Sequence, residues 1–351
     1  MSTESAAHDM HHRFEPARAT STGRVEELVR AALATAGDPT ITSGERAELL
    51  MELAMSLQVR PKTPDHLPAA IRLYEEALLA CPTDDLLLRT RVTARQATAL
   101  QALPGGGVEE LERARKSFEE AIPVLGQLGS PEELAEAEMN LGLVLQCLAP
   151  AGRARIADAV AAYQRALRVF DAKRYPLEFV LLQNNLATAF LSMPFDGERG
   201  KLREALAVQC FEEGLKAVTL VDHPVEYAML QNNLGNALQY AASRHFVENS
   251  LRALEAYDEA LKVRTRRTMP AEYANTIANK ANCLRNMPDD LGRPEAGNAA
   301  NLAWARSLYD EAHQVFVELG EMEKAHAVAE AIAEMDAEAN GLTAAPSGAP
   351  V

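Results

Sequence analysis

Asparagine recurs at one position of a periodic pattern along the chain. Asn140, Asn185, Asn233 and Asn279 each stand nine residues after a proline. Residues three or four positions apart share one face of a helix, so polar side chains at these steps extend the series. With their polar neighbours, the candidate binding residues are Asn140, Asn184, Asn185, Thr188, Asn232, Asn233, Asn236, Tyr240, Asn275, Asn279, Asn282 and Asn286. Amide side chains both donate and accept hydrogen bonds, which is the chemistry that an extended peptide backbone requires.

The asparagine series has three interpretations. Asparagine is a poor residue for a helix interior, so its recurrence needs a reason. We expect the amides of successive copies to form a ladder along a groove, where they would bind a peptide or a partner protein. They could instead bridge neighbouring repeats, or be solvated surface amides without a role. Arg91, Arg95 and Arg285 would add positive charge near the groove and suit an acidic ligand.

The prolines themselves mark a repeat of 45 to 49 residues. Pro82, Pro131, Pro176, Pro224 and Pro270 head successive copies. Two of these copies contain the near-identical segments LQNNLATAF (182–190) and LQNNLGNAL (230–238). A fixed period of this size predicts copies of one supersecondary unit stacked into an array.

Each copy is expected to contain two helices. Apolar residues after the proline follow a helical period, and proline suits the first position of a helix. The second helix carries an aromatic residue three positions before Ala or Gly, as in AYQRAL, CFEEGL and AYDEAL. Clusters of Gly, Pro and Asp separate the helices. The predicted solenoid spans 23–339, with hairpins near 43–80, 82–129, 131–172, 176–220, 224–268 and 270–319, an opening helix near 23–36 and a capping helix at 321–339. Residues 1–22 and 340–351 lack periodicity and are predicted to be disordered tails.

These landmarks resemble tetratricopeptide repeats over roughly residues 66–339. A HEAT-type array would have a similar period, but the Leu-Gly or Leu-Ala pair, the aromatic-x-x-Ala pattern and the final proline occur in tetratricopeptide order. LQNNLG and LQNNLA are similar to the first helices of kinesin light chain repeats. The MP and GxR-like loops are similar to those of bacterial arrays associated with CHAT proteases.

The resemblance implies an all-α, right-handed α-solenoid of about six hairpins with capping helices at both ends. It also implies a protein-interaction module that acts as an adaptor or regulator in bacterial signalling. In such a module the first-helix face that carries the asparagines lines the concave groove, and the asparagines contact an extended peptide. A CHAT-type protease or another signalling protein is a candidate partner. The main alternative is a self-associating structural scaffold.

Net charge, cysteine spacing and the lack of long apolar stretches argue against several classes of function. The 351 residues carry a net charge of −15, which opposes binding to nucleic-acid phosphates and suits a neutral or basic partner. The cysteines (Cys81, Cys147, Cys210 and Cys283) form no CxxC pair, so neither a zinc ribbon nor a dithiol site is indicated. The sequence shows neither a signal-like core nor an apolar stretch of membrane length, and we expect a cytoplasmic protein.

No arrangement of residues predicts catalysis. A Ser-His-Asp, Cys-His or paired-carboxylate pattern is not legible, so we expect no enzyme activity and no cofactor. His8, His11 and His12 could hold a transition metal, but a tail lacks the outer hydrogen bonds that orient metal ligands, and we expect no native metal site there.

Two residues depart from the repeat pattern, and one basic cluster stands beside them. The first copy has Arg91 where the others have asparagine. Lys280 stands where other copies have Leu or Val, so its helix is expected to pack differently or to turn a charge outward. The basic cluster at Lys262, Arg264, Arg266 and Arg267 ends a second helix, where cations favour the helix dipole. We interpret it as a solvated helix end rather than a docking patch.

Overall fold

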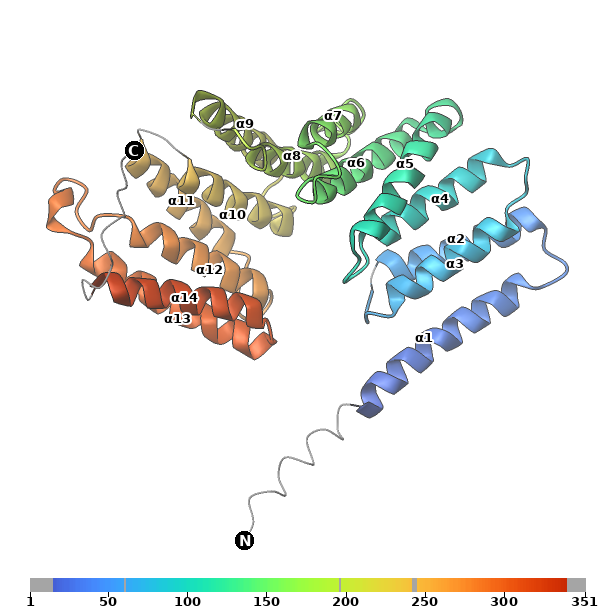
Figure 1. Ribbon diagram of the computed structural model, residues 1–351, viewed down its shortest axis with the longest axis horizontal. Helices are drawn as coiled ribbons and strands as arrows, with labels where there is room; N and C mark the ends of the chain where they lie inside the picture. The colour runs from blue at the N-terminus through green and yellow to red at the C-terminus, as the bar shows by residue number, and fades with distance from the viewer. Residues whose placement is uncertain (1–14, 60, 196, 242–244, 340–351) are drawn as a thin grey trace, which may run out of the picture. The chain divides into compact units, whose positions relative to one another are not determined.

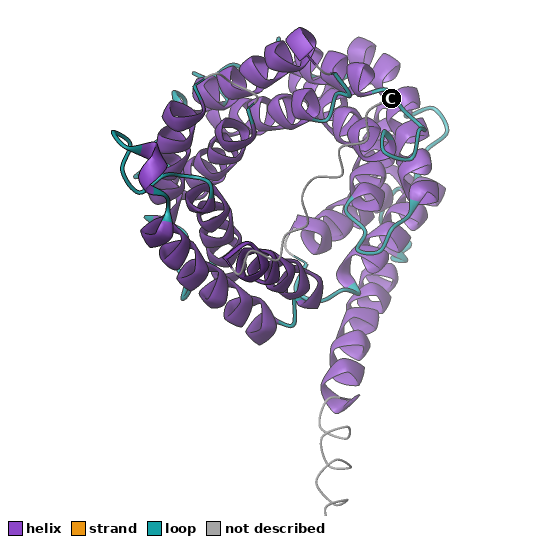
Figure 2. Ribbon diagram, turned by 60° about the vertical axis from the view of Figure 1, so that its left-hand side comes forward, coloured by secondary structure: helices purple, strands orange, loops and turns teal. Residues whose placement is uncertain are grey.

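The chain is helical throughout the computed structural model, which describes residues 15–59, 61–195, 197–241 and 245–339. No strand occurs within these ranges (Figure 2). The helices form two compact units, residues 1–170 (unit 1) and residues 171–351 (unit 2). Most of both predicted tails lies outside the described residues, and so do His8, His11 and His12. Residues 15–22, which were predicted to belong to a disordered tail, are instead helical and form the start of a helix that begins at Glu15.

The helices follow one another in pairs (Figure 1). Unit 1 contains α1 (Glu15–Ala36), α2 (Ser43–Val59), α3 (His66–Ala80), α4 (Leu86–Gln101), α5 (Val108–Leu128), α6 (Pro131–Leu148) and α7 (Ile156–Ala166). Unit 2 contains α8 (Pro176–Leu191), α9 (Gly197–Leu215), α10 (Pro224–Tyr240), α11 (Phe246–Leu261), α12 (Pro270–Arg285), the short η1 (Pro294–Ala296), α13 (Ala299–Leu319) and α14 (Met322–Ala339). We call α2, α4, α6, α8, α10 and α12 the first helices and the partner that follows each the second helix.

Proline begins most of the first helices. The repeat proline is the first residue of α6, α8, α10 and α12. A glutamate stands within two residues of each proline, where its negative charge interacts favourably with the helix dipole. The first copy differs, because α4 begins at Leu86, about one turn after Pro82. Asp85 caps this helix by accepting a hydrogen bond from the Leu88 amide at 2.9 Å.

Successive helix pairs pack in chain order, which confirms an α-solenoid. The two helices of each pair pack against one another, from α2 with α3 to α12 with α13. Within each unit the second helix then packs onto the first helix of the next pair, as α5 does on α6 and α11 on α12. First helices also contact each other: α2 with α4, α4 with α6, α8 with α10 and α10 with α12. Each unit is therefore layered, with its first helices side by side.

The aromatic residue of the second helix fills the space inside each pair. Tyr163 and Tyr257 are both fully buried. A Cβ atom at Gly142 would lie 2.4 Å from Tyr163 Cε1, and one at Gly235 would lie 2.6 Å from Tyr257 Cε1. The glycine of the Leu-Gly pair is therefore required, because the tyrosine ring that packs on it leaves no room for a Cβ atom.

Helix α14 closes the C-terminal end of unit 2. It packs on α13 and contributes Ala325, Val328 and Met335 to the core cluster that includes Phe316. Arg285 of α12, whose side chain is 13% exposed, pairs with Glu334 at 3.2 Å and also with Glu338. No helix in the described ranges is long and apolar enough to span a membrane.

Candidate functional site

The predicted asparagines of unit 2 lie on three neighbouring first helices. We call their shared surface the amide face; its polar residues are Asn184, Asn185, Thr188, Asn232, Asn233, Asn236, Tyr240, Asn275, Asn279, Asn282 and Asn286. Because α8 contacts α10 and α10 contacts α12, these residues form one continuous surface. Asn140 belongs to unit 1, where it lies on α6.

Asparagines on α8 and α10 bond to each other across the repeat boundary. Asn233 Nδ2 donates to Asn184 Oδ1 at 2.8 Å. Adjacent amides within each helix are also linked, Asn184 Nδ2 to Asn185 Oδ1 at 3.3 Å and Asn232 Nδ2 to Asn233 Oδ1 at 3.1 Å. Asn232 is buried and the other three are half-buried. The hydrogen bond to the neighbouring first helix thus explains why an asparagine stands in the middle of the helix.

The same contact recurs between α10 and α12. Asn279 Nδ2 donates to Asn232 Oδ1 at 3.3 Å, and the buried Thr276 hydroxyl lies 3.1 Å from the same oxygen. At both junctions the ninth residue after one proline bonds to the eighth residue after the preceding proline. We call the bonded set Asn184, Asn185, Asn232, Asn233, Thr276 and Asn279 the amide seam. Its members bridge neighbouring repeats, which is the second of the three interpretations given above.

The C-terminal ends of these helices carry a second set of contacts. Asn282 Nδ2 donates to the Tyr240 hydroxyl at 2.6 Å, which ties α12 to α10. The Tyr257 hydroxyl of α11 lies 2.8 Å from both Asn236 Oδ1 and Gln239 Oε1, so it donates to one or the other of these two oxygens. Burial raises the pKa of Tyr257 well above its usual range, so this hydroxyl remains a donor at any physiological pH. Tyr240 itself is 67% exposed and presents its ring to solvent.

The remaining predicted residues bond locally or lie at the edge of the face. Thr188 Oγ1 donates to the Asn185 carbonyl at 3.0 Å, and Asn286 Nδ2 donates to the Asn282 carbonyl at 3.0 Å. Asn286 is exposed, and Asn275 is half-buried.

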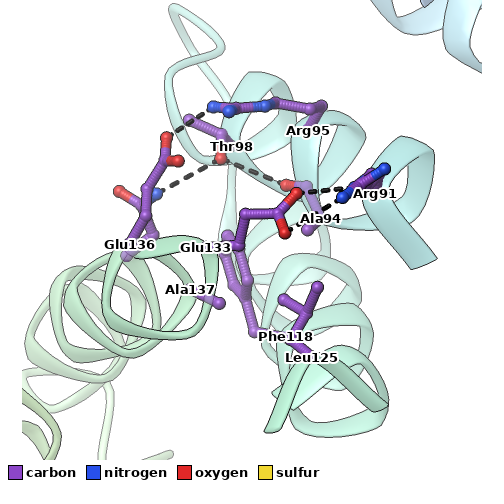
Figure 3. Close-up of a pocket in the computed structure, with 10 residues that line it drawn as sticks. Arg91, Ala94, Arg95, Thr98, Phe118, Leu125, Glu133, Glu136 and Ala137 are labelled. Atoms are coloured by element: carbon purple, nitrogen blue, oxygen red, sulfur yellow. Dashed lines mark hydrogen bonds and ion pairs between the residues drawn. The ribbon is translucent and has the colours of Figure 1, made fainter. Parts of the chain in front are cut away.

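In unit 1 the corresponding contacts are ionic (Figure 3). Arg91 Nε on α4 donates to Glu133 Oε1 on α6 at 2.6 Å, and Arg95 pairs with Glu136. The hydrogen bond from Arg91, helped by the Ser130 amide, lowers the pKa of Glu133 below its usual value. Each arginine is thus neutralised by a glutamate instead of adding free positive charge for a ligand.

Asn140 belongs to this ionic boundary. Its Nδ2 atom lies 3.4 Å from Thr98 Oγ1, so it links α6 to α4 as the unit 2 asparagines link their helices. Asn140 is one of the residues that line a partly open hollow of about 30 Å³, which has room for about one water molecule. Figure 3 shows other residues of its lining. This volume is far below that of a typical ligand pocket.

The amide face also contains apolar residues that were missing from the predicted set. Leu177 is 40% exposed, Leu181 is 39% exposed and Val225 is 50% exposed. They stand one or five residues after the repeat proline, and at 100° per residue these positions share the side of the helix that carries Thr188, Asn236 and Tyr240. The same angular argument, applied to apolar as well as polar residues, would have found them in the sequence.

Lys280 is buried instead of turned outward. Its side chain is 8% exposed, and its ammonium pairs with Asp258 of α11. The ammonium also lies 4.7 Å from the ring centroid of Trp304 on α13. The expected outward charge is therefore replaced by an internal link between two second helices.

The basic cluster divides into exposed and buried members. Lys262, Arg266 and Arg267 are exposed, as a solvated helix end would be, but Arg264 is 8% exposed. Its Nη1 atom donates to Thr276 Oγ1 at 2.9 Å, which attaches it to the amide seam. The interpretation of Arg264 as a solvated side chain was wrong.

Metal and thiol chemistry find little support in the structure. Among the described residues, no group of three or more His, Cys, Asp or Glu side chains is arranged to hold a metal ion. All four cysteines are free. Burial raises the pKa of Cys210 and Cys283 to about 11, so both thiols are protonated at neutral pH.

No protein-family model matches the chain, and no curated protein matches it either. Among solved structures, the chain is similar to a circular tandem repeat protein with novel repeat topology and enhanced subunit contact surfaces. The two are 14% identical with a TM-score of 0.29, over 97% of this chain and 93% of that chain. The solenoid architecture rests on the packing of this chain's own helices.

Proposed function

We propose that the chain is a protein-interaction module and that the amide face of unit 2 binds an extended segment of a partner protein. The observation that carries this proposal is the pairing of exposed apolar residues with amides on one surface. Leu177, Leu181 and Val225 offer apolar area that no neighbouring helix covers fully, and such exposed apolar groups rimmed by polar residues are typical of interaction sites. The amides beside them offer hydrogen bonds to the backbone of the bound segment.

The resemblance to tetratricopeptide repeats supports the same proposal. Within it, the module acts as a cytoplasmic adaptor or regulator in bacterial signalling, and a CHAT-type protease or another signalling protein is the candidate partner. The amide seam holds the successive first helices of unit 2 together, which suits a preorganised surface that loses little entropy on binding.

Affinity purification from the native host, read by mass spectrometry, tests the proposal. The wild-type chain is compared with the double variant Leu181→Asp/Val225→Asp. The control is Leu202→Asp, which changes a 61% exposed leucine on the second helix α9. We expect a stoichiometric partner with the wild type and the control, and its loss with the double variant.

Two other outcomes of this experiment would contradict the proposed binding face. A partner retained by the double variant but lost in the control would move the interface to the second helices. Recovery of the chain alone, as a defined oligomer that all three proteins form, would favour the self-associating scaffold.

A further inference from the structure

One copy of the repeat lacks a large apolar side chain where its first helix ends. The seventeenth residue after the repeat proline is large and apolar in three other copies, as Leu148, Met193 and Met287. Leu148 and Met287 are buried. After α10 the same position holds Ala241, which is only half-buried. The first copy also has an alanine there, Ala99, but its surroundings bury it fully.

A pocket lies beside Ala241, and we call it the α10 pocket. Its volume is about 520 Å³, which falls within the range of about 300–1,000 Å³ that small-molecule sites occupy. Its lining comes from α9, from the C-terminal end of α10 and from the N-terminal half of α11. Both second helices pack on α10, and no residue of the amide face belongs to the lining. The pocket is therefore a second feature of unit 2, separate from the proposed binding face.

The apolar part of the lining consists of small or partly covered side chains. Leu238 is buried, and Val208 packs against the same core cluster as Leu238. Ala205 and Ala241, which also line the pocket, leave open the space that larger side chains would fill. This surface offers van der Waals contact and a place out of water to the apolar body of a ligand.

Two amides on opposite sides of the pocket are available for hydrogen bonds. Gln209 lies on α9 and Asn249 lies on α11. Within the described part of unit 2, neither side-chain amide has a hydrogen-bond partner. Each of them can donate to an oxygen of a bound molecule.

The lysine, arginine and glutamate side chains of the lining already have partners of opposite charge. The pairs are Lys201 with Glu198 at 2.7 Å, Arg252 with Glu212 at 2.6 Å, and Arg203 with Glu204 at 3.7 Å. Arg252 lies on α11 and Glu212 on α9, so their pair also joins the two helices beside the pocket. A charged ligand would have to compete with these existing partners, whereas a neutral ligand would not.

We propose that the α10 pocket binds a neutral small molecule with an apolar body and an oxygen that accepts hydrogen bonds. The apolar body would lie against Val208, Leu238 and Ala241, where other copies place a leucine or methionine side chain. The oxygen would accept from Gln209 or Asn249. This site goes beyond the proposed function, because it lies on the side of the second helices and requires no partner protein.

Fluorescence titration with prodan (6-propionyl-2-dimethylaminonaphthalene) tests this inference. Prodan is neutral, has an apolar naphthalene body and a ketone oxygen, and its emission shifts to shorter wavelength in apolar surroundings. The wild type is compared with Ala241→Met, which restores the side chain that Met287 supplies in the next copy. The control is Ala303→Met, which adds the same side chain at an exposed position of α13. We expect saturable binding to wild type and control, and a rise in Kd of about tenfold or more in Ala241→Met.

A second variant tests the two amides. Gln209→Leu/Asn249→Leu keeps the approximate size of both side chains but removes their N–H groups. Its Kd for prodan is expected to rise about threefold or more, as loss of one hydrogen bond implies. An unchanged or lower Kd would refute recognition of the oxygen by these amides.

Several results would overturn the assignment of the pocket. Absence of saturable binding to the wild type, or equal Kd values for wild type and Ala241→Met, would show that the pocket takes no such ligand. Tighter binding of the anionic dye 8-anilinonaphthalene-1-sulfonate, lost in Ala241→Met, would refute the preference for a neutral molecule. Binding lost in Leu181→Asp/Val225→Asp but kept in Ala241→Met would place the probe on the amide face. Circular dichroism of each variant confirms that its helices are intact.

Discussion

At the scale of single residues, steric and electrostatic requirements explain substitutions that the repeat pattern alone leaves open. Gly142 and Gly235 are glycines because a tyrosine ring occupies the space where a Cβ atom would lie. Asn233 and Asn279 are asparagines because the preceding helix supplies an amide oxygen to each. Lys280 and Arg264 replace apolar residues of other copies, and each makes a polar link between helices that those copies lack.

Gly235→Ala is expected to destabilise unit 2. The new methyl group would lie 2.6 Å from the Tyr257 ring, and overpacking of this kind costs about 1–3 kcal/mol. Gly126→Ala in α5 is the matched control, because the atom nearest to its new methyl group, Leu134 Cδ2, would lie 4.0 Å away. That change is expected to stabilise by up to about 1 kcal/mol through helix propensity. Urea unfolding followed by circular dichroism measures both, and equal effects of the two changes would contradict the steric account.

Lys280→Leu is expected to leave stability unchanged or to raise it. Leucine occupies the equivalent positions Leu186 and Leu234, so the site accommodates an apolar side chain. The change also leaves no buried charge behind, because the side chain of Asp258 is 57% exposed and its carboxylate stays in water. Asp258→Ala should be the more harmful change, because it leaves the buried ammonium of Lys280 without its carboxylate. The emission of Trp304, the single tryptophan, follows unfolding of this region. Greater loss from Lys280→Leu than from Asp258→Ala would refute this ordering.

At the scale of helices, the two units use different chemistry to join successive first helices. Ion pairs connect α4 to α6, whereas amides connect α8, α10 and α12. The sequence predicted the helix pairs and the face that carries the asparagines, because both follow from a 3.6-residue period. The sequence alone could not decide whether the asparagines bind a ligand or bridge neighbouring repeats. Asn233 and Asn184 are 49 residues apart, and whether they meet depends on how the helices stack.

The start of α4 shows a second limit of the pattern. The proline spacing placed the head of this copy at Pro82, but the helix begins at Leu86. An aspartate that can cap a helix stands just before that residue, and the capping hydrogen bond from Leu88 decides the boundary. The period alone does not predict such a local capping contact. Nor does it predict the ion pairs of Arg91 and Arg95, whose glutamate partners lie 42 and 41 residues further along the chain.

The ionic contact between α4 and α6 predicts a pH dependence. The pKa of Glu133 is lowered from 4.5 by the Arg91 hydrogen bond, so its stabilising contribution is present above pH 4.5 and is lost as the pH falls through the lowered value. The free energy of unfolding should therefore fall more steeply below pH 4.5 in the wild type than in Glu133→Gln. Urea titrations from pH 7 to pH 3 measure the difference. Parallel curves for the two proteins would show that this pair contributes nothing.

At the scale of the whole molecule, the chain consists of two solenoid units, and α14 closes the second. α14 covers the core cluster around Phe316 with three apolar residues and covers Arg285 with two glutamates. Terminal repeats need such a cap because the last hairpin would otherwise expose its apolar face.

Deletion of residues 321–351 is expected to lower the melting temperature of unit 2 and to cause concentration-dependent association. The deletion uncovers Ile277, Val315 and Phe316, which are all buried in the intact chain. Circular dichroism and light scattering after size-exclusion chromatography measure the two effects. Glu323→Gln is the control, since it changes an exposed residue of α14 without removing the helix. A monodisperse truncated chain with an unchanged melting temperature would show that α14 is dispensable.

Site-specific photocrosslinking in the native host tests the binding role of the amide face most directly. A benzophenone amino acid is placed at Leu181 or Val225 on the amide face, or at Leu202 on the second helix α9, all of which are exposed. The account predicts that the first two positions crosslink to the same partner protein and that Leu202 does not. Crosslinks from Leu202 alone, or from none of the three positions while a partner co-purifies, would contradict it.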